Sequence, residues 1–139
     1  MDCAISEKPH AQATCEHITF IGGINMAGVA ISMLANDKRK SIEELAAILK
    51  NEINAELVYD SPRPLENASA WLLSFERYYF RNGSYATLTI MLTESGDQQT
   101  ADIIGSGGGE GIFNISWGAN SSFASMAVDL LQQCGFKES

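Results

Sequence analysis

Apolar side chains recur at helical spacing just after residue 41. They fall on one face of a helix with 3.6 residues per turn, and they are Ile42, Leu45, Ile48, Leu49 and Ile53. Ser41 with Glu44 three residues later has the pattern of a capping box, which marks a helix start. The pattern predicts an amphipathic helix over 42–53.

Aromatic and β-branched runs alternate with compact turn signals over the middle of the chain, which is typical of an antiparallel meander. Asn82-Gly83 supplies the two residues that a type I′ hairpin turn needs. A short strand at 57–59 precedes the meander and is expected to stop at 60–64, where Pro62 and Pro64 lie. The predicted meander strands are 71–80, 85–93, 99–104 and 112–117.

A second amphipathic helix is predicted from about Ser121 to Cys134, capped by Asn120 or Ser121 and ended by Gly135. The order of helix, strand, meander and helix indicates the α+β class. We expect an antiparallel meander sheet of about four to five strands, with the two amphipathic helices packed on one face.

Three regions follow from these patterns. Residues 1–16 lack apolar periodicity and are predicted to be a flexible tail. Residues 17–40 form an N-terminal extension, with a short strand at 18–21 and a helix over 26–34. Residues 41–139 form the α+β domain.

The chain has 139 residues, of which 45% are hydrophobic, and a net charge of -8. This length and apolar content suit one domain, and the acidic balance argues against nucleic acid and anionic membranes as partners. Residues 18–35 are uncharged, but glycines dilute this run too much for a membrane span. Three cysteines without framework spacing, and no signal peptide, predict a cytoplasmic protein.

The sequence offers few candidate residues for catalysis or metal binding. Both histidines, His10 and His17, lie within the first 17 residues, outside the α+β domain, so histidine-dependent nucleophilic catalysis would require this segment to fold back. With Cys3 and Cys15 they could ligate zinc, but the spacing matches no known finger. We therefore expect no metal and lean against an enzyme.

Residues 18–27 locally resemble the nucleotide-binding turn of pyrroline-5-carboxylate reductases. Ile24, however, stands where that family has the glycine that admits the pyrophosphate. No cofactor is expected.

A glycine-rich run at 105–111 is predicted to be a plain connection, with a mobile flap over a pocket as the alternative. On strand 71–80, Arg77 and Arg81 flank Tyr79 on one face and could hold an anion, although the sequence favours their pairing with surface carboxylates. Asp102 and Glu110 could also pair as acid and base, although nothing fixes their separation. The candidate ligand-binding residues are Arg77, Tyr79, Arg81, Gly107, Gly109, Glu110 and Trp117.

The segments 56–59, 75–81, 104–109 and 116–119 together resemble a family of small uncharacterised proteins from Firmicutes. The likeness covers about residues 41–136. It implies a bacterial cytosolic domain and carries no activity or catalytic residue.

The function predicted from these observations is a small binding or protein-interaction module. Edge strands and aromatic residues on both faces of strand 71–80 favour a homodimer through the sheet. The alternative is an enzyme or ligand-binding protein, with an anionic small molecule held under the glycine-rich loop by Arg77 and Arg81.

Overall fold

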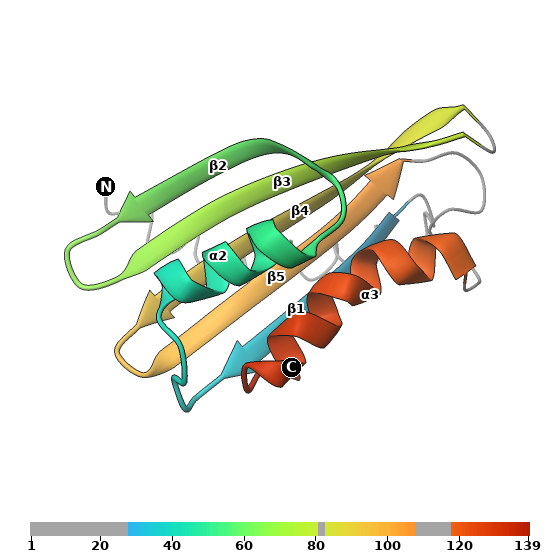
Figure 1. Cartoon of the computed structure of the whole chain (residues 1–139). Coiled ribbons are helices and arrows are strands. Elements are labelled where there is room, and N and C mark those ends of the chain that lie inside the picture. The colour runs from blue at the N-terminus through green and yellow to red at the C-terminus, as the bar shows by residue number, and fades with distance from the viewer. Residues whose placement is uncertain (1–27, 81–82, 108–117) are drawn as a thin grey trace, which may run out of the picture.

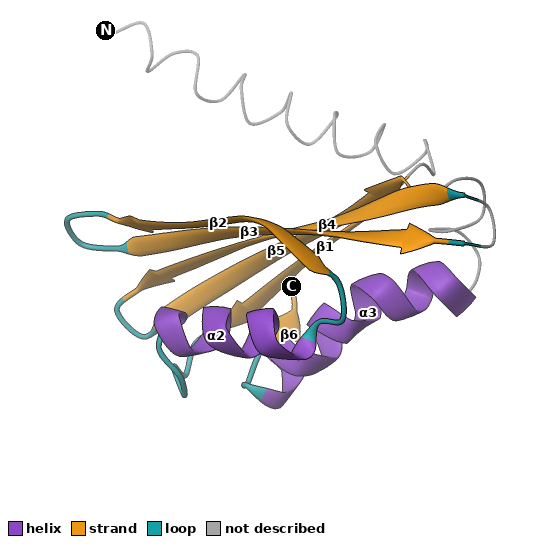
Figure 2. Ribbon diagram, turned by 45° about the horizontal axis from the view of Figure 1, so that its top comes forward, coloured by secondary structure: helices purple, strands orange, loops and turns teal. Residues whose placement is uncertain are grey.

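The computed structural model describes residues 28–80, 83–107 and 118–139. Six strands and two helices make up this part of the chain; Figure 1 labels all of them except β6, which is labelled in Figure 2. In chain order they are β1 (Gly28–Ala35), α2 (Ile42–Glu52), β2 (Glu56–Pro64), β3 (Ser69–Tyr79), β4 (Ser84–Ser95), β5 (Gln98–Gly107), α3 (Gly118–Gln133) and β6 (Lys137–Glu138).

All six strands belong to one sheet, in the order β2-β3-β4-β5-β1-β6, and every neighbouring pair is antiparallel. Strands β2 to β5 follow one another as a meander. The first strand, β1, lies between β5 and the short β6, so that Ile31 faces Ile103. The sheet therefore joins the first and last described strands of the chain to the middle ones.

Both helices lie on the same side of the sheet (Figure 2). Helix α2 contacts β3 and β4, and α3 contacts β5. Alternate side chains of the strands meet them there, such as Leu88, Ile90 and Leu92 of β4, which are fully buried. Each such side chain contributes about 1.5–3 kcal/mol when it leaves water, so this layer supplies most of the hydrophobic stabilisation.

Helix α2 begins where the sequence predicts. The N–H of Glu44 donates to the Ser41 hydroxyl at 3.2 Å, and the Ser41 N–H donates to the Glu44 carboxylate at 2.9 Å, which completes the capping box. The helix ends at Glu52, one residue before the predicted end. Helix α3 begins at Gly118, earlier than the predicted Ser121.

Glu94, at the end of β4, ties the start of α2 to the sheet. One carboxylate oxygen accepts the Ile42 N–H and the Gln99 amide, each at 2.9 Å, and the other lies 3.2 Å from the Lys38 ammonium. Burial by itself raises the pKa of Glu94, but the hydrogen bonds from Gln99 and Lys38, the charge of Lys38 and the Ile42 N–H outweigh it. The pKa therefore lies below the ordinary value of 4.5.

The α+β class, with an antiparallel sheet and two helices, is confirmed, but the sheet has six described strands rather than four to five. The helix predicted over 26–34 is wrong, because residues 28–35 form a strand inside the sheet. The stop predicted at 60–64 is also wrong. Strand β2 continues to Pro64 because it is an edge strand, where a proline need not donate to a neighbour. The predicted strands at 18–21 and 112–117 lie outside the described residues.

Candidate interaction surface

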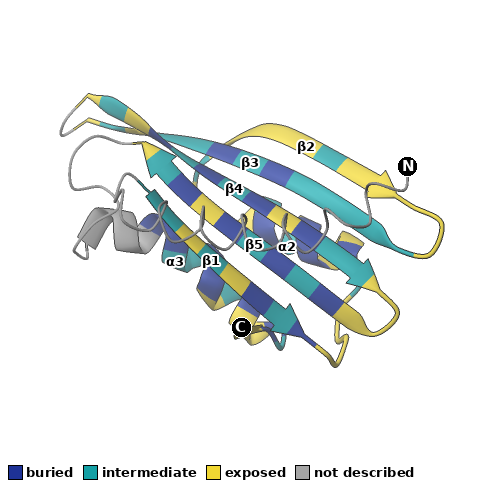
Figure 3. Ribbon diagram, turned by 180° about the vertical axis from the view of Figure 1, so that it is seen from behind, coloured by how far each residue is buried: buried dark blue, intermediate teal, exposed yellow. Residues whose placement is uncertain are grey.

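The side of the sheet opposite the helices is not covered by any described element (Figure 3). We call it the open face. By register and alternation, its side chains come from β2 (Glu56, Tyr59, Ser61, Arg63), β3 (Ala70, Leu72, Ser74, Glu76, Tyr78), β4 (Tyr85, Thr87, Thr89, Met91, Thr93), β5 (Thr100, Asp102, Ile104, Ser106), β1 (Ala30, Ser32, Leu34) and the edge strand β6 (Lys137).

Large apolar side chains of the open face are accessible to solvent. Met91 is 41% exposed and Ile104 is 49% exposed, although both come from central strands. At one end Tyr78 and Tyr85 are 41% and 56% exposed, and their ring centroids are 4.9 Å apart. A row of exposed apolar groups across neighbouring strands marks an interaction surface more strongly than single scattered ones.

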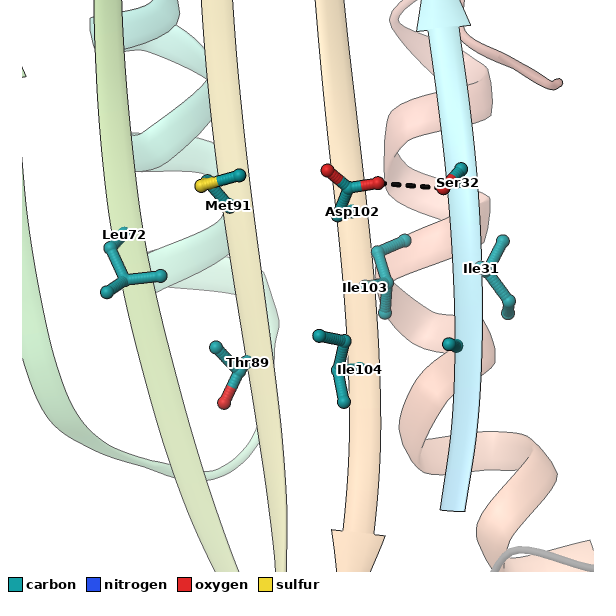
Figure 4. A pocket seen from close by; sticks show the side chains of 9 residues that line it. Ile31, Ser32, Leu72, Thr89, Met91, Asp102, Ile103 and Ile104 are labelled. Carbon is teal, nitrogen blue, oxygen red and sulfur yellow. Dashed lines mark hydrogen bonds between the residues drawn. The ribbon is translucent and has the colours of Figure 1, made fainter. Parts of the chain in front are cut away.

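An open depression of about 310 Å³ occupies the middle of this face (Figure 4). Most of its lining is apolar, and side chains of β3, β4 and β5 such as Leu72, Met91 and Ile104 contribute to it. On its β1 side, the Ser32 hydroxyl donates to the Asp102 carboxylate at 2.7 Å. The depression thus combines an apolar floor with one charged group.

The hydroxyl groups of the open face are bonded largely to one another. Thr87 lies 2.9 Å from the Ser106 hydroxyl, and Ser74 lies 3.3 Å from that of Thr89. Thr93 and Thr100 form a further cross-strand pair. Because each pair already satisfies a donor, a covering surface need not supply a partner for it. The face can therefore be buried at low desolvation cost.

Arg77 lies on the helix side of β3. Its Nε and one terminal nitrogen donate to the Asn54 carbonyl at 3.0 and 2.6 Å. The guanidinium also lies 4.7 Å from the Phe123 ring centroid and 5.9 Å from that of Tyr79. These contacts link the end of α2 to α3 and leave fewer donors for an anion.

The other predicted site residues are brought together only in part. Tyr79 shares the helix side with Arg77, and its buried hydroxyl has no hydrogen-bond partner among the described residues. Gly107 ends β5 with a φ of 81°, next to the Tyr85 carbonyl. Arg81, Gly109, Glu110 and Trp117 lie outside the described residues, so the anionic ligand site stays a prediction. The pairing of Asp102 with Glu110 stays untested for the same reason.

The metal-binding, nucleotide-binding and thiol groups considered from the sequence can also be located relative to the described residues. Within residues 28–80, 83–107 and 118–139, no group of three or more His, Cys, Asp or Glu residues could hold a metal ion. The zinc-capable Cys3, His10, Cys15 and His17 and the turn at 18–27 lie outside these ranges. Cys134 is buried, and burial raises the pKa of its thiol, although Lys40 and Arg39 act in the opposite direction.

The sequence favoured a homodimer through the sheet, but none of the residues of the open face was among the predicted site residues. Leucine and isoleucine alternate with threonine in 87–93, and this pattern by itself predicts one buried and one wetter face of the sheet. The pattern does not give the register of the strands, which places Leu72 on one side of Met91 and Asp102 on the other. Asp102 itself was considered only as half of a catalytic pair.

A family of unknown function matches residues 26–135 of the chain. A search of curated proteins with the chain found no match. No helix in the described part of the chain is long and apolar enough to cross a membrane.

Proposed function

The chain belongs to that family, DUF6054, and from this premise we propose that it is a small protein-interaction module that pairs with a second copy of itself through the open face. The observation that carries the proposal is the exposed apolar row on central strands, with Met91 and Ile104 at its middle. Central strands normally bury both of their faces or keep the outer one polar.

The size of the face supports a second copy as the occupant. Five strands, β2 to β1, are each eight to twelve residues long. With strands about 4.8 Å apart and a rise of about 3.3 Å per residue, they span roughly 600–900 Å². A stable interface takes about 800 Å² from each partner. Two such sheets packed face to face would form a sandwich about 10 Å thick.

Charge also fits this arrangement. The chain carries a net charge of -8, but the register places few charged residues on the open face. They are Glu56, Arg63, Glu76 and Asp102, with Lys137 at its β6 edge. Most of the acidic groups therefore stay outside the contact. Two copies still repel each other at long range, so salt should strengthen the pairing by screening.

Sedimentation equilibrium of the full chain tests the proposal. We expect a mass near twice 15.0 kDa that shifts toward the monomer in Ile104→Lys and Met91→Lys. The matched control is Leu65→Lys, because Leu65 is 64% exposed but lies in the β2–β3 turn, outside the open face. The proposal would be refuted if the wild-type chain stayed monomeric up to roughly millimolar concentration. At that concentration only a dimer with a binding free energy weaker than about -4 kcal/mol would escape detection.

The cytosolic location belongs with this proposal. Three cysteines without framework spacing support a reducing compartment. We also keep the expectation that neither nucleic acid nor a membrane is a partner, which rests on the acidic balance of the chain.

A further inference from the structure

Among the charged residues of the open face, Arg63 and Asp102 are a cation and an anion at matching places on either side of the midline of the face. Arg63 lies on β2 opposite Ala70, which in turn faces Thr93, and Asp102 lies on β5 opposite Met91. If the midline is drawn between β3 and β4, then β2 and β5 lie equally far from it. Along the strands the two residues differ by only two positions.

Neither charge is neutralised within the described residues. The ion pairs there are Lys38 with Glu94 and Lys50 with Asp60. Asp102 accepts a hydrogen bond from Ser32, a neutral group, and Arg63 is exposed. Lys137, opposite Leu34 on β6, is two strands away from Asp102.

We infer that two copies dock with Arg63 of each chain paired to Asp102 of the other, which fixes the register of the dimer; the inference rests on the proposed function. In an isologous dimer the same patch of both copies must be self-complementary. A two-fold axis parallel to the strands along the midline lays β2 of one copy over β5 of the other, and β3 over β4. Each Arg63 then faces the partner's Asp102 with an offset of two residues.

The distances permit this contact. Sheets pack about 10 Å apart, and two residues along a strand cover about 7 Å, so the two Cα atoms would lie about 12 Å from each other. Extended arginine and aspartate side chains bridge such a gap. A guanidinium meeting a carboxylate makes a directional, charge-assisted contact, which suits a role in fixing register.

The same axis matches the apolar groups of the face. It places Leu72 over the partner's Met91 and Tyr59 over the partner's Ile104, while Glu76 faces the partner's Thr87. An axis perpendicular to the strands would instead stack β5 on β5 and bring the two Asp102 carboxylates close together. Like charges at a contact oppose it, so the arrangement with the parallel axis is favoured.

Charge reversal tests the pairing in the full chain. We expect Arg63→Glu and Asp102→Lys each to raise the dimer dissociation constant by at least about tenfold, and the double variant to return it to within about threefold of wild type. Two control variants lie outside the open face. Glu66→Lys in the β2–β3 turn makes the same change in net charge as Asp102→Lys, and Lys40→Glu in the loop between β1 and α2 makes the same change as Arg63→Glu. Thermal melting of each variant shows that it folds.

The outcomes separate the two proposals. Rescue by the double variant, beyond what the two control substitutions do, supports the ion pairs. If the wild type dimerises but the swap restores nothing, the register is wrong and the open face remains the interface. A wild type that is monomeric at every concentration overturns both the pairing and the proposed function.

Discussion

Replacing Glu94 by glutamine probes how α2 is held to the sheet. The amide keeps the shape of the side chain but removes the charge that accepts the Ile42 N–H and the Gln99 amide and faces Lys38. A hydrogen bond to a charged group is worth about 1 kcal/mol more than a neutral one. A carboxylate at a helix N-terminus adds about 0.3–1 kcal/mol. We expect the substitution to lower the free energy of unfolding by about 2 kcal/mol at neutral pH.

The pH dependence gives this prediction a second, independent part. Because the pKa of Glu94 in the folded chain lies below 4.5, its carboxylate contributes stability that is full above that value. The contribution is lost as the pH falls through the folded-state pKa, since the group must then take up a proton in the folded protein as well. The difference between wild type and Glu94→Gln should therefore be constant from pH 7 to about 5.5 and shrink below about 4.5.

Urea unfolding at a series of pH values, followed by circular dichroism, measures both parts. Glu43→Gln is the matched control, because Glu43 lies in the first turn of the same helix and is exposed. We expect it to change the free energy of unfolding by less than about 1 kcal/mol. A Glu94→Gln chain as stable as wild type at pH 7 would refute the account, as would a difference that stays the same at pH 3.5.

Two further predictions concern a glycine and a thiol. Gly107→Ala should cost at least about 1 kcal/mol more than Gly96→Ala in urea unfolding. Both glycines have positive φ, but a Cβ on Gly107 would also lie 2.9 Å from the Tyr85 carbonyl oxygen, whereas Gly96 is open; equal costs would contradict this. With the two N-terminal cysteines replaced by serine, Cys134 should react with a disulfide reagent at least about tenfold more slowly in the folded than in the unfolded chain. A rate independent of urea would show that the thiol is accessible.

The elements that the sequence predicted correctly are those with strong local sequence patterns. The helix over 42–53 has both an apolar stripe and a capping box, and the structure ends it one residue earlier. The hairpin between β3 and β4 has a turn signal of its own, and Gly83 has the positive φ of 66° that such a turn requires. Where local chemistry and tertiary packing agree, one sequence is enough to locate an element.

Strand β1 shows where local patterns fail. Val29, Ile31 and Met33 face the core, but Ala30 and Leu34 on the opposite face are also apolar, so the apolar and polar alternation of a strand is hidden. The strand forms because β5 and β6 pair with it on either side, and that pairing is not encoded nearby. The residues of the open face were missed for a related reason: they come from separate strands, and only the register of those strands brings them together.

The place of β1 in the sheet bears on how the chain folds as it is synthesised. Ser32 and Asp102, which face each other on β1 and β5, are 70 residues apart in the chain. Strands β2 to β5 pair through short hairpins and can form in the order in which they leave the ribosome, whereas β1 must wait for β5. Until then β1, whose side chains carry no charge, has no neighbouring strand to pair with. A pause in translation before residue 98 would prolong that interval, and it is there that we expect the nascent chain to be most prone to aggregation and most dependent on a chaperone.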